Sequence, residues 1–481
     1  MPSSVFLVNP PYIRVVYGLK KASAVKPPLG LAYVAASLEH NGFKVEILDA
    51  NAEFLNIQET VERILRSNVK YIGFTAVSAT MSLVFQISEL VKAKNAEKFI
   101  FVGGPHATFT AVSTLKDCLA IDAVIQGEGE ITVCELIEAL ENGKNLSEIA
   151  GLAFRKKQGE IIENSPRSLI ENINFIPVPA RHLLSLELYS PSAILNMGFK
   201  GKKYATVITA RGCPNRCVFC SSAAFWKIVR IRTPENVVGE LEFLIEKYGV
   251  KHIDFLDDTL VLSKKRIEDI CALMLQKNLN LKWTCYARVN HITSEIVALM
   301  KKAGCEFIQF GVESGSQKIL NRIKKNINLD EVRQAVKIVK KAGVKSMCDF
   351  MVGLPEDTKE TIQQTIDFAK ELSPNFAFFS ITTPFPGTEL YNEYLKAGIL
   401  KPGFIWDNVS LHEKTGFFTP TLTSQQLQNL YFKAHHSFYY RPAFIWQTFV
   451  WLLRHPKDLK NFIVLVSMQI FRELRNIFNK G

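Results

Sequence analysis

The sequence lacks the features that mark membrane-spanning and secreted proteins. No apolar run in its 481 residues continues for long enough to cross a bilayer. The first four residues lead straight into a strand-like run, so we expect no signal peptide. Nine cysteines without a secretory signal argue against a disulfide framework and favour a reducing, cytoplasmic location.

The sequence also lacks a block of like charge and an evident RNA-binding module, although it is basic overall. Its 58 Lys and Arg residues exceed its 46 Asp and Glu residues, which gives a net charge of +12. We therefore expect no nucleic-acid partner. Binding to a membrane surface or to an acidic substrate could still account for the excess of positive charge. Hydrophobic residues make up 47% of the chain, which is ample for the two or three domains that this length implies.

Three cysteines at C-x3-C-x2-C spacing share one short loop: Cys213, Cys217 and Cys220. The loop follows a strand-like run at residues 204–209, which Gly212 and Pro214 interrupt. Three thiolates on one loop can hold three irons of a four-iron, four-sulfur (4Fe-4S) cluster and leave the fourth iron open to a ligand. The next cysteine is Cys271, so a structural zinc site with four nearby ligands is poorly matched.

This loop resembles the cluster-binding loop of radical S-adenosylmethionine (radical SAM) enzymes, including an aromatic residue, Phe219, before the last cysteine. The resemblance implies that the open iron binds the amino and carboxylate groups of S-adenosylmethionine. One-electron reduction then cleaves that molecule to a 5′-deoxyadenosyl radical, with flavodoxin or ferredoxin as the expected electron donor. Such chemistry belongs to the cofactors, and the protein positions them.

Strands and helices alternate through residues 1–150, which predicts a doubly wound, flavodoxin-like domain with a parallel sheet. Ligands on such sheets bind at the carboxyl ends of the strands. Taken singly, each glycine there is explained by a tight turn. Polar or glycine-rich segments follow the predicted strands: Asn9-Pro10-Pro11, Ser78-Ala79-Thr80, Gly103-Gly104 and Gly127-Glu128-Gly129.

Ahead of a radical loop, these segments together resemble the cobalamin-binding domain of cobalamin-dependent radical SAM enzymes. The resemblance implies that the glycine loops approach the corrin ring and that residues 78–80 hold its lower face and tail. Many such domains carry a D-x-H-x-x-G loop whose His ligates cobalt, but residues 9–12 contain no His. We therefore expect no protein His below the cobalt. His106 is the nearest alternative ligand, but the favoured interpretation is a loop His that bonds to the backbone. The implied cobalamin contacts are Ser78, Thr80, Gly103, Gly104, Gly127, Glu128 and Gly129.

Residues 151–199 form an expected connector with a hairpin at 151–164 and a Pro-rich crossing segment. Residues 200–400 then repeat a strand–helix unit six times, which predicts a partial (β/α)6 barrel of the TIM type. Barrel sites lie at the carboxyl ends of the strands. Four isolated cysteines in this region are expected to be small buried hydrophobes: Cys271, Cys285, Cys305 and Cys348.

Polar residues end three of the predicted barrel strands. Asp257 or Asp258 is predicted to accept the amino group of S-adenosylmethionine, with solvated loop acids and helix caps as the alternative. Arg288 can fork onto a carboxylate, either that of S-adenosylmethionine or that of one of these two residues. Residues 311–316 resemble the G-x-E/Q-S-G-S motif that contacts the ribose and methionine part, which implies roles for Glu313 and Ser314.

Residues 401–481 are rich in aromatic and basic side chains. Two apolar runs, 444–453 and 462–471, are each too short to span a bilayer. They predict either a helix pair at a membrane interface, and hence peripheral membrane contact, or helices packed over the barrel mouth.

The resemblance covers nearly the whole chain and implies a cobalamin-dependent radical enzyme with three cofactors: the cluster, S-adenosylmethionine and cobalamin. The favoured activity is methylation of an unactivated carbon in a bulky, apolar small molecule, such as a hopanoid, another lipid or a tetrapyrrole. Radical cyclisation or carbon–carbon bond formation without methyl transfer is the alternative, and a cluster-bearing sensor without turnover is the third reading.

Overall fold

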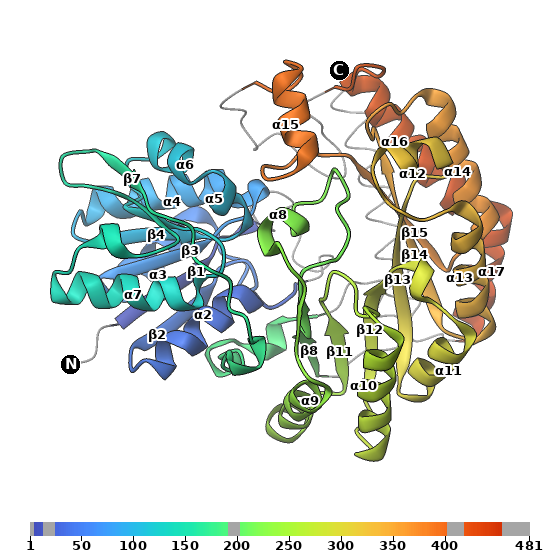
Figure 1. The fold of residues 1–481 in the computed structure, drawn as a ribbon, viewed down its shortest axis with the longest axis horizontal. Helices are drawn as coiled ribbons and strands as arrows, with labels where there is room; N and C mark the ends of the chain where they lie inside the picture. The colour runs from blue at the N-terminus through green and yellow to red at the C-terminus, as the bar shows by residue number, and fades with distance from the viewer. Residues whose placement is uncertain (1–3, 13–24, 191–202, 402–417, 455–481) are drawn as a thin grey trace.

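The computed structural model describes residues 4–12, 25–190, 203–401 and 418–454, and Figure 1 shows two β-sheets that each carry their own helices. The first sheet has the strand order β2-β1-β3-β4-β5-β6-β7. Strands β1 to β5 are parallel, whereas β6 and β7 are antiparallel additions at one edge. The strands are β1 (Ser4–Asn9), β2 (Lys44–Asp49), β3 (Tyr71–Thr75), β4 (Phe99–Gly103), β5 (Ala123–Ile125), β6 (Leu152–Arg155) and β7 (Ile161–Glu163).

Helices cover both faces of this sheet because its strands are apolar on both faces. In β1, Val5 and Leu7 pack with α2 and α7, whereas Phe6 and Val8 pack with α3 and α4 on the other face. Successive side chains of a strand point to opposite faces, so one strand serves two cores. The helices are α2 (Leu29–His40), α3 (Ile57–Arg66), α4 (Met81–Lys94), α5 (Pro105–Phe109), α6 (Ala111–Asp117) and α7 (Gly129–Asn142).

Two features of this region differ from the sequence prediction. The predicted hairpin forms as β6 and β7, but it joins the first sheet through β5, so that sheet extends beyond residue 150. Helices α5 and α6 were not predicted, because the Gly-Gly-Pro sequence at residues 103–105 suggests only a loop. Pro105 instead occupies the first turn of α5, where its missing N–H costs nothing.

The second sheet is a six-stranded parallel sheet with the order β15-β14-β13-β12-β11-β8, and it confirms the predicted partial barrel. Its helices lie on the outer face (Figure 1). The strands are β8 (Tyr204–Val207), β11 (His252–Phe255), β12 (Lys282–Ala287), β13 (Cys305–Glu313), β14 (Lys345–Val352) and β15 (Phe376–Ile381). The helices between them are α9 (Pro234–Tyr248), α10 (Lys264–Gln276), α11 (Ser294–Lys302), α12 (Gln317–Arg322), α13 (Leu329–Lys341) and α14 (Lys359–Leu372).

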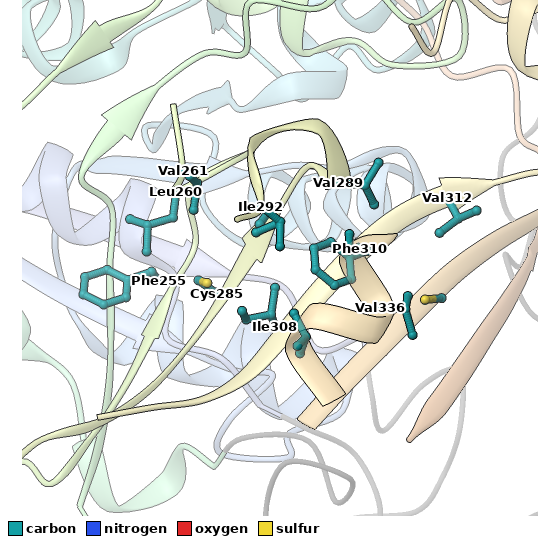
Figure 2. Packing of buried hydrophobic residues seen from close by; sticks show 14 of the residues in the cluster. Phe255, Leu260, Val261, Cys285, Val289, Ile292, Ile308, Phe310, Val312 and Val336 are labelled. Atoms are coloured by element: carbon teal, nitrogen blue, oxygen red, sulfur yellow. The ribbon is translucent and has the colours of Figure 1, made fainter. Parts of the chain in front are cut away.

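One continuous apolar core joins this sheet to its helices. Figure 2 shows part of it, with Phe255 and Cys285 from neighbouring strands beside Ile308 and Phe310 of β13. These side chains are almost completely buried. The four isolated cysteines of the barrel are buried as predicted, and they fill core space as small hydrophobes.

The two sheets meet at their carboxyl edges. Phe109 of α5 packs edge-on against Phe225 of α8 (Ser222–Trp226), with ring centroids 6.2 Å apart. The ring of Phe109 also lies directly against Gly387, in the loop before α15 (Glu389–Lys396), and a Cβ there would collide with it. Figure 1 shows α8 between the two sheets. The loops that follow the strands of one sheet therefore face the loops that follow the strands of the other.

The structure decides between neither of the two alternatives predicted for the C-terminal runs, and it adds a helix, α16 (Ser424–Tyr439), that was not predicted. The apolar side of α16 packs on α14 and β15, with Leu427, Tyr431 and Phe438 buried. This packing lies on the outer side of the last barrel strand. Helix α17 (Pro442–Arg454) follows, while the run at 462–471 lies outside the described residues. Among the described helices, none is both long and apolar enough to cross a membrane.

Candidate active site

The three cysteines of the cluster loop are the only ones not buried, and all nine lie within the described residues. Cys213 and Cys217 are half-buried and Cys220 is exposed. Between them, Val218 is buried, donates its N–H to the carbonyl of Ile323 at 3.1 Å and accepts from Leu390 N–H at 2.9 Å. The loop is thus anchored by one apolar residue while its thiols lie outside the core.

Two of the sulfur atoms already have hydrogen-bond donors beside them. Asn215 Nδ2 lies 3.5 Å from Cys213 Sγ, and Arg288 Nη1 lies 4.0 Å from Cys217 Sγ. Amide and guanidinium N–H groups stabilise thiolates, and hydrogen bonds to cysteine sulfur tune iron–sulfur clusters. Three accessible thiols on one loop with such donors therefore fit a 4Fe-4S cluster.

Asp257 and Asp258 follow strand β11, but the structure gives them different surroundings. Asp257 is buried and accepts from Thr209 N–H at 2.8 Å, from the Thr209 hydroxyl and from Ala210 N–H. Burial raises its pKa to about 6, although the charge of Arg266 and these hydrogen bonds act to lower it. Asp257 thus braces the backbone that leads into the cluster loop. Its carboxylate oxygens already accept hydrogen bonds from that backbone.

Asp258 is exposed at the edge of the cluster loop, where Ser222 Oγ donates to Oδ2 at 2.5 Å. Of the two adjacent carboxylates, Asp258 is therefore the one that can still reach a ligand.

Arg288 and Glu313 meet around Lys325, a residue that the sequence analysis did not single out. The guanidinium of Arg288 donates to the carbonyl of Lys325, and Lys325 Nζ lies 2.6 Å from Glu313 Oε1. A side chain at Gly311 would come within 2.5 Å of that carboxylate. The glycine of the 311–316 motif therefore makes room for a buried ion pair. Ser314 instead faces α14, with its hydroxyl 3.1 Å from that of Thr365.

The face of the second sheet that is turned away from the helices carries a polar layer. Gln309 Nε2 donates to both oxygens of Asp349, at 2.9 and 2.7 Å. Lys26, from the first domain, pairs with Asp254 at 2.8 Å and lies over the ring of Tyr286. Burial raises the pKa of Asp349 to about 7, even though the bond from Gln309 acts to lower it.

The predicted cobalamin segments lie at the carboxyl edge of the first sheet. Ser78, in the short helix η1 (Ser78–Thr80), has its hydroxyl 2.8 Å from His106 Nδ1, so this ring nitrogen meets a side chain where a backbone partner was predicted. Burial lowers the pKa of His106 to about 4, so its imidazole is neutral near pH 7. Thr80 bonds to the backbone of Val77. These contacts order the loop after β3 internally.

The glycines at this edge have two distinct structural reasons. Gly104 has φ of +106°, and a Cβ would lie 2.6 Å from the carbonyl oxygen of Ala76, so only glycine fits. Gly127 also has positive φ, but no heavy atom would come within 4 Å of its Cβ. The backbone after β5 therefore borders open space, which fits the close approach of a flat ring such as corrin.

Glu128 lies next to that open space but makes ionic contacts to the other domain. Its carboxylate pairs with Arg211 and with Arg230 Nη1, the latter at 2.7 Å, and accepts from Ile170 N–H. Burial alone would raise its pKa, but the hydrogen bond from Arg230 and the charge of Arg211 lower it below the ordinary value. The sequence analysis missed Arg211, Arg230 and Glu130 as partners. The sequence features that could have indicated this pairing are the two acidic residues in one glycine loop and the arginine beside the cluster cysteines.

Two family models match the chain: the B12 binding domain over residues 18–137 and the radical SAM superfamily over residues 207–369. An uncharacterized methyltransferase of Pyrococcus horikoshii is 38% identical over 441 residues, which cover 91% of this chain and 93% of that protein. The chain belongs to the cobalamin-dependent radical SAM enzymes.

Two further matches of this radical SAM enzyme share less sequence identity with it. The anaerobic magnesium-protoporphyrin IX monomethyl ester cyclase of Rubrivivax gelatinosus is 28% identical over 404 residues, covering 82% of this chain and 70% of that protein. The solved structure of the radical SAM methyltransferase TsrM from Kitasatospora setae, with cobalamin and a 4Fe-4S cluster bound, has a TM-score of 0.72 at 16% identity. It covers 90% of this chain and 91% of that one, and at this identity the likeness concerns the fold.

A cobalamin-dependent radical SAM enzyme uses a 4Fe-4S cluster, S-adenosylmethionine and cobalamin, so the prediction of these three cofactors is confirmed. The predicted order of an α/β cobalamin domain and a partial barrel is confirmed as well. The individual contact residues for each cofactor stay predictions.

The two adjacent carboxylates give a matched test of the brace. Asp257→Ala removes the oxygen that accepts from the N–H groups of Thr209 and Ala210, which leaves two buried donors unsatisfied. We expect a loss of about 2 kcal/mol in the free energy of unfolding, measured by urea denaturation of the cofactor-free protein. Asp258→Ala, at an exposed position, should stay within about 0.5 kcal/mol of the wild type. Equal losses in both variants would contradict the brace.

Asp349 predicts a pH dependence of stability. A carboxyl whose folded pKa is raised from 3.8 to about 7 contributes stability below pH 4, and this contribution is lost as the pH rises through 7. Asp349→Asn removes that titration. Relative to the wild type, the variant should gain about 2–3 kcal/mol in the free energy of unfolding between pH 5 and pH 8. A constant difference over this range would show that Asp349 is ionised throughout.

Proposed function

We propose that this enzyme transfers a methyl group to an unactivated carbon of a bulky, apolar small molecule. The observation that carries the proposal is the apposition of the two sheets at their carboxyl edges, through Phe109, Phe225 and Gly387. A group can pass between molecules bound at two sites only where those sites are held close together. A domain packed anywhere else on the barrel would not permit such a transfer.

The inner face of the barrel sheet supports an apolar substrate with a polar group. In β14, alternate residues are buried against the helices, while Met347, Asp349 and Met351 are half-exposed on the opposite face. Phe376 and Phe378 of β15 are half-exposed in the same way. Methionine and phenylalanine line sites for large apolar molecules, and the few polar groups orient them. The cyclase among the relatives acts, by its name, on a large tetrapyrrole, which fits the same size class.

We assign the cofactor contacts by position. Cys213, Cys217 and Cys220 hold the cluster, and its S-adenosylmethionine lies against Asp258, Arg288 and the strand-end residues Glu313 and Ser314. When bound, these groups supply the radical and the methyl group, and the chain supplies the orientation. Ser78, Thr80 and the glycine loops at 103–104 and 127–129 border the cobalamin, with Glu128 bonded away from it. We assign no cobalt ligand to His106, whose Nδ1 lies beside Ser78.

The first experiment is anaerobic reconstitution with iron, sulfide and hydroxocobalamin, followed by reduction with S-adenosylmethionine. We expect roughly one cobalt and four irons per chain, with both 5′-deoxyadenosine and S-adenosylhomocysteine as products. Cys220→Ala should lose iron and 5′-deoxyadenosine formation while keeping cobalt. Cys134→Ala, which removes a buried thiol of the first domain, is the matched control and should keep both metals.

The products separate this proposal from its alternatives. If 5′-deoxyadenosine forms without S-adenosylhomocysteine, the enzyme is a cyclase or another carbon–carbon bond-forming enzyme. If neither product forms in a protein that holds both metals, the hypothesis of a sensor without turnover replaces the proposed methyltransferase. Iron without cobalt would refute a cobalamin-dependent methyl transfer.

A second proposal concerns the place where the enzyme encounters an apolar substrate, which is the surface of a membrane. Helix α17 exposes four large apolar side chains on one side: Ile445, Trp446, Phe449 and Leu453. Trp446 is 64% exposed and Leu453 66% exposed. From residue 421 onward the sequence is strongly basic, with only Asp458 and Glu473 as acidic residues. An aromatic, apolar helix in a basic segment suits the interface of an anionic membrane, and we propose peripheral contact there.

Flotation of the full-length protein with liposomes checks this contact. We expect binding to vesicles rich in phosphatidylserine, and a loss of roughly tenfold or more when Trp446 and Phe449 are both changed to Ser. Phe175→Ser is the control, because Phe175 is 83% exposed in the connector, far from α17 in the sequence. Flotation that is unchanged in the double variant, or absent in the wild type, would contradict the membrane role.

A further inference from the structure

We propose that Arg211 is a positioning residue, which fixes the cluster loop relative to the cobalamin domain through Glu128 and Glu130. Arg211 precedes Cys213 by two residues, and the two glutamates belong to the loop after β5 and the start of α7. The proposal rests on the binding of both cofactors and is independent of methyl transfer.

The contact is a fork between one guanidinium and two carboxylates. Arg211 Nη1 pairs with Glu128 Oε1, and Nη2 pairs with Glu130 Oε1. The three side chains are only 7%, 4% and 8% exposed, in the order Arg211, Glu128 and Glu130. The rings of Tyr33 and Trp226 lie over the guanidinium, with centroids 5.3 and 5.5 Å away. Two carboxylates and two rings leave the planar group one orientation.

A second arginine ties the same glutamate to the opposite strand of a small ribbon. Arg211 ends β9 (Ala210–Arg211), and its partner across the antiparallel pair is Arg230 of β10 (Arg230–Ile231). Arg230 Nη1 lies 2.7 Å from Glu128 Oε2 and 2.8 Å from the carbonyl oxygen of Ile170. Both strands that flank the cluster loop are therefore attached to one residue of the other domain.

The attachment reaches the cysteines through a rigid turn. Gly212, between Arg211 and Cys213, has φ of +97°, and a Cβ there would lie 2.7 Å from the carbonyl oxygen of Ile228. Where the chain enters the cluster loop, its backbone at Gly212 thus packs closely against the backbone at Ile228, just before β10. A displacement of Arg211 consequently displaces Cys213.

Stability alone does not explain this arrangement. Four buried charges are costly to desolvate, and well-packed apolar residues commonly stabilise a protein as much or more. What ion pairs add is geometry, since they are satisfied in one relative position of the two domains. A misplacement of only about 1 Å between reacting groups can cost two orders of magnitude in rate, so such a restraint has a use here.

Glu130→Gln tests the proposal without altering the cluster loop. The full-length variant is loaded with cluster and cobalamin, reduced without substrate, and examined by electron paramagnetic resonance for the dipolar coupling between the cob(II)alamin and cluster spins. We expect iron and cobalt contents like those of the wild type, and a spread of couplings that widens roughly twofold. Arg211→Gln should have the same effect, and the double variant should add nothing further, because both changes break one contact.

Two further variants separate positioning from simple stabilisation. Arg211→Lys keeps the charge but loses the fork, so it should restore stability and leave the couplings broad. Arg333→Gln removes an exposed arginine fork onto the two oxygens of Glu371, within one domain, and should leave the couplings unchanged. A lower melting temperature with wild-type couplings in Glu130→Gln and Arg211→Gln would overturn the proposal, as would additive effects in the double variant.

Discussion

The structure depends on one constraint: the parallel strands of the two sheets have to point their carboxyl ends toward each other. In sheets of this kind, the loops that bind ligands lie at the carboxyl edge. Apolar contact between Phe109 and Gly387 brings the edges together, and the fork of Arg211 on Glu128 and Glu130 gives them one orientation. In the proposed methyl transfer, the loops of the two edges act as a pair, so their relative position is a property of the whole chain rather than of either domain.

The same edge explains the unusual density of buried charge. Asp257, Glu128 and Glu240 are all buried, and each pairs with or lies near an arginine. Charges in such places need partners, because an isolated buried ion is far costlier than a paired one. Loops lack the internal hydrogen bonding of helices and strands, so side chains must satisfy their backbone. The ion pairs and carboxylate braces thus hold irregular segments that regular secondary structure does not.

Much of this fold follows from local patterns in the sequence. The strands and long helices of both sheets were predicted because each is a periodic apolar run bounded by glycine or polar residues. Short elements were missed: α5, α8 and the two-residue strands β9 and β10 contain too few residues for a period to appear. The three cysteines of the cluster loop were assigned from their spacing alone, and the structure adds that their thiols are the accessible ones among the nine cysteines.

The rest of the site was less predictable because it depends on contacts between distant segments. Asp257 and Asp258 are neighbours with the same chemistry, and only the fold shows that one is used by Thr209 and Ala210. Glu128 looked like part of a cobalamin loop, yet its partner Arg211 is 83 residues away. A pairing over that separation leaves no periodic pattern in a single sequence. Glu128 and the segment around Arg211 were therefore each interpreted from their own sequence neighbours.

Backbone strain near the cluster loop indicates that part of the site is organised before any ligand binds. Glu313, Lys324 and Asn326 all have positive φ, between 54° and 71°, and none is glycine. Each such residue costs on the order of 1–3 kcal/mol unless its surroundings compensate. Here the compensation centres on Lys325, which pairs with Glu313 and accepts from Arg288, the residue beside Cys217. A chain that tolerates this cost holds the guanidinium of Arg288 beside Cys217, and the carboxylate of Glu313 on Lys325, before any ligand binds, so binding there need not reorganise them.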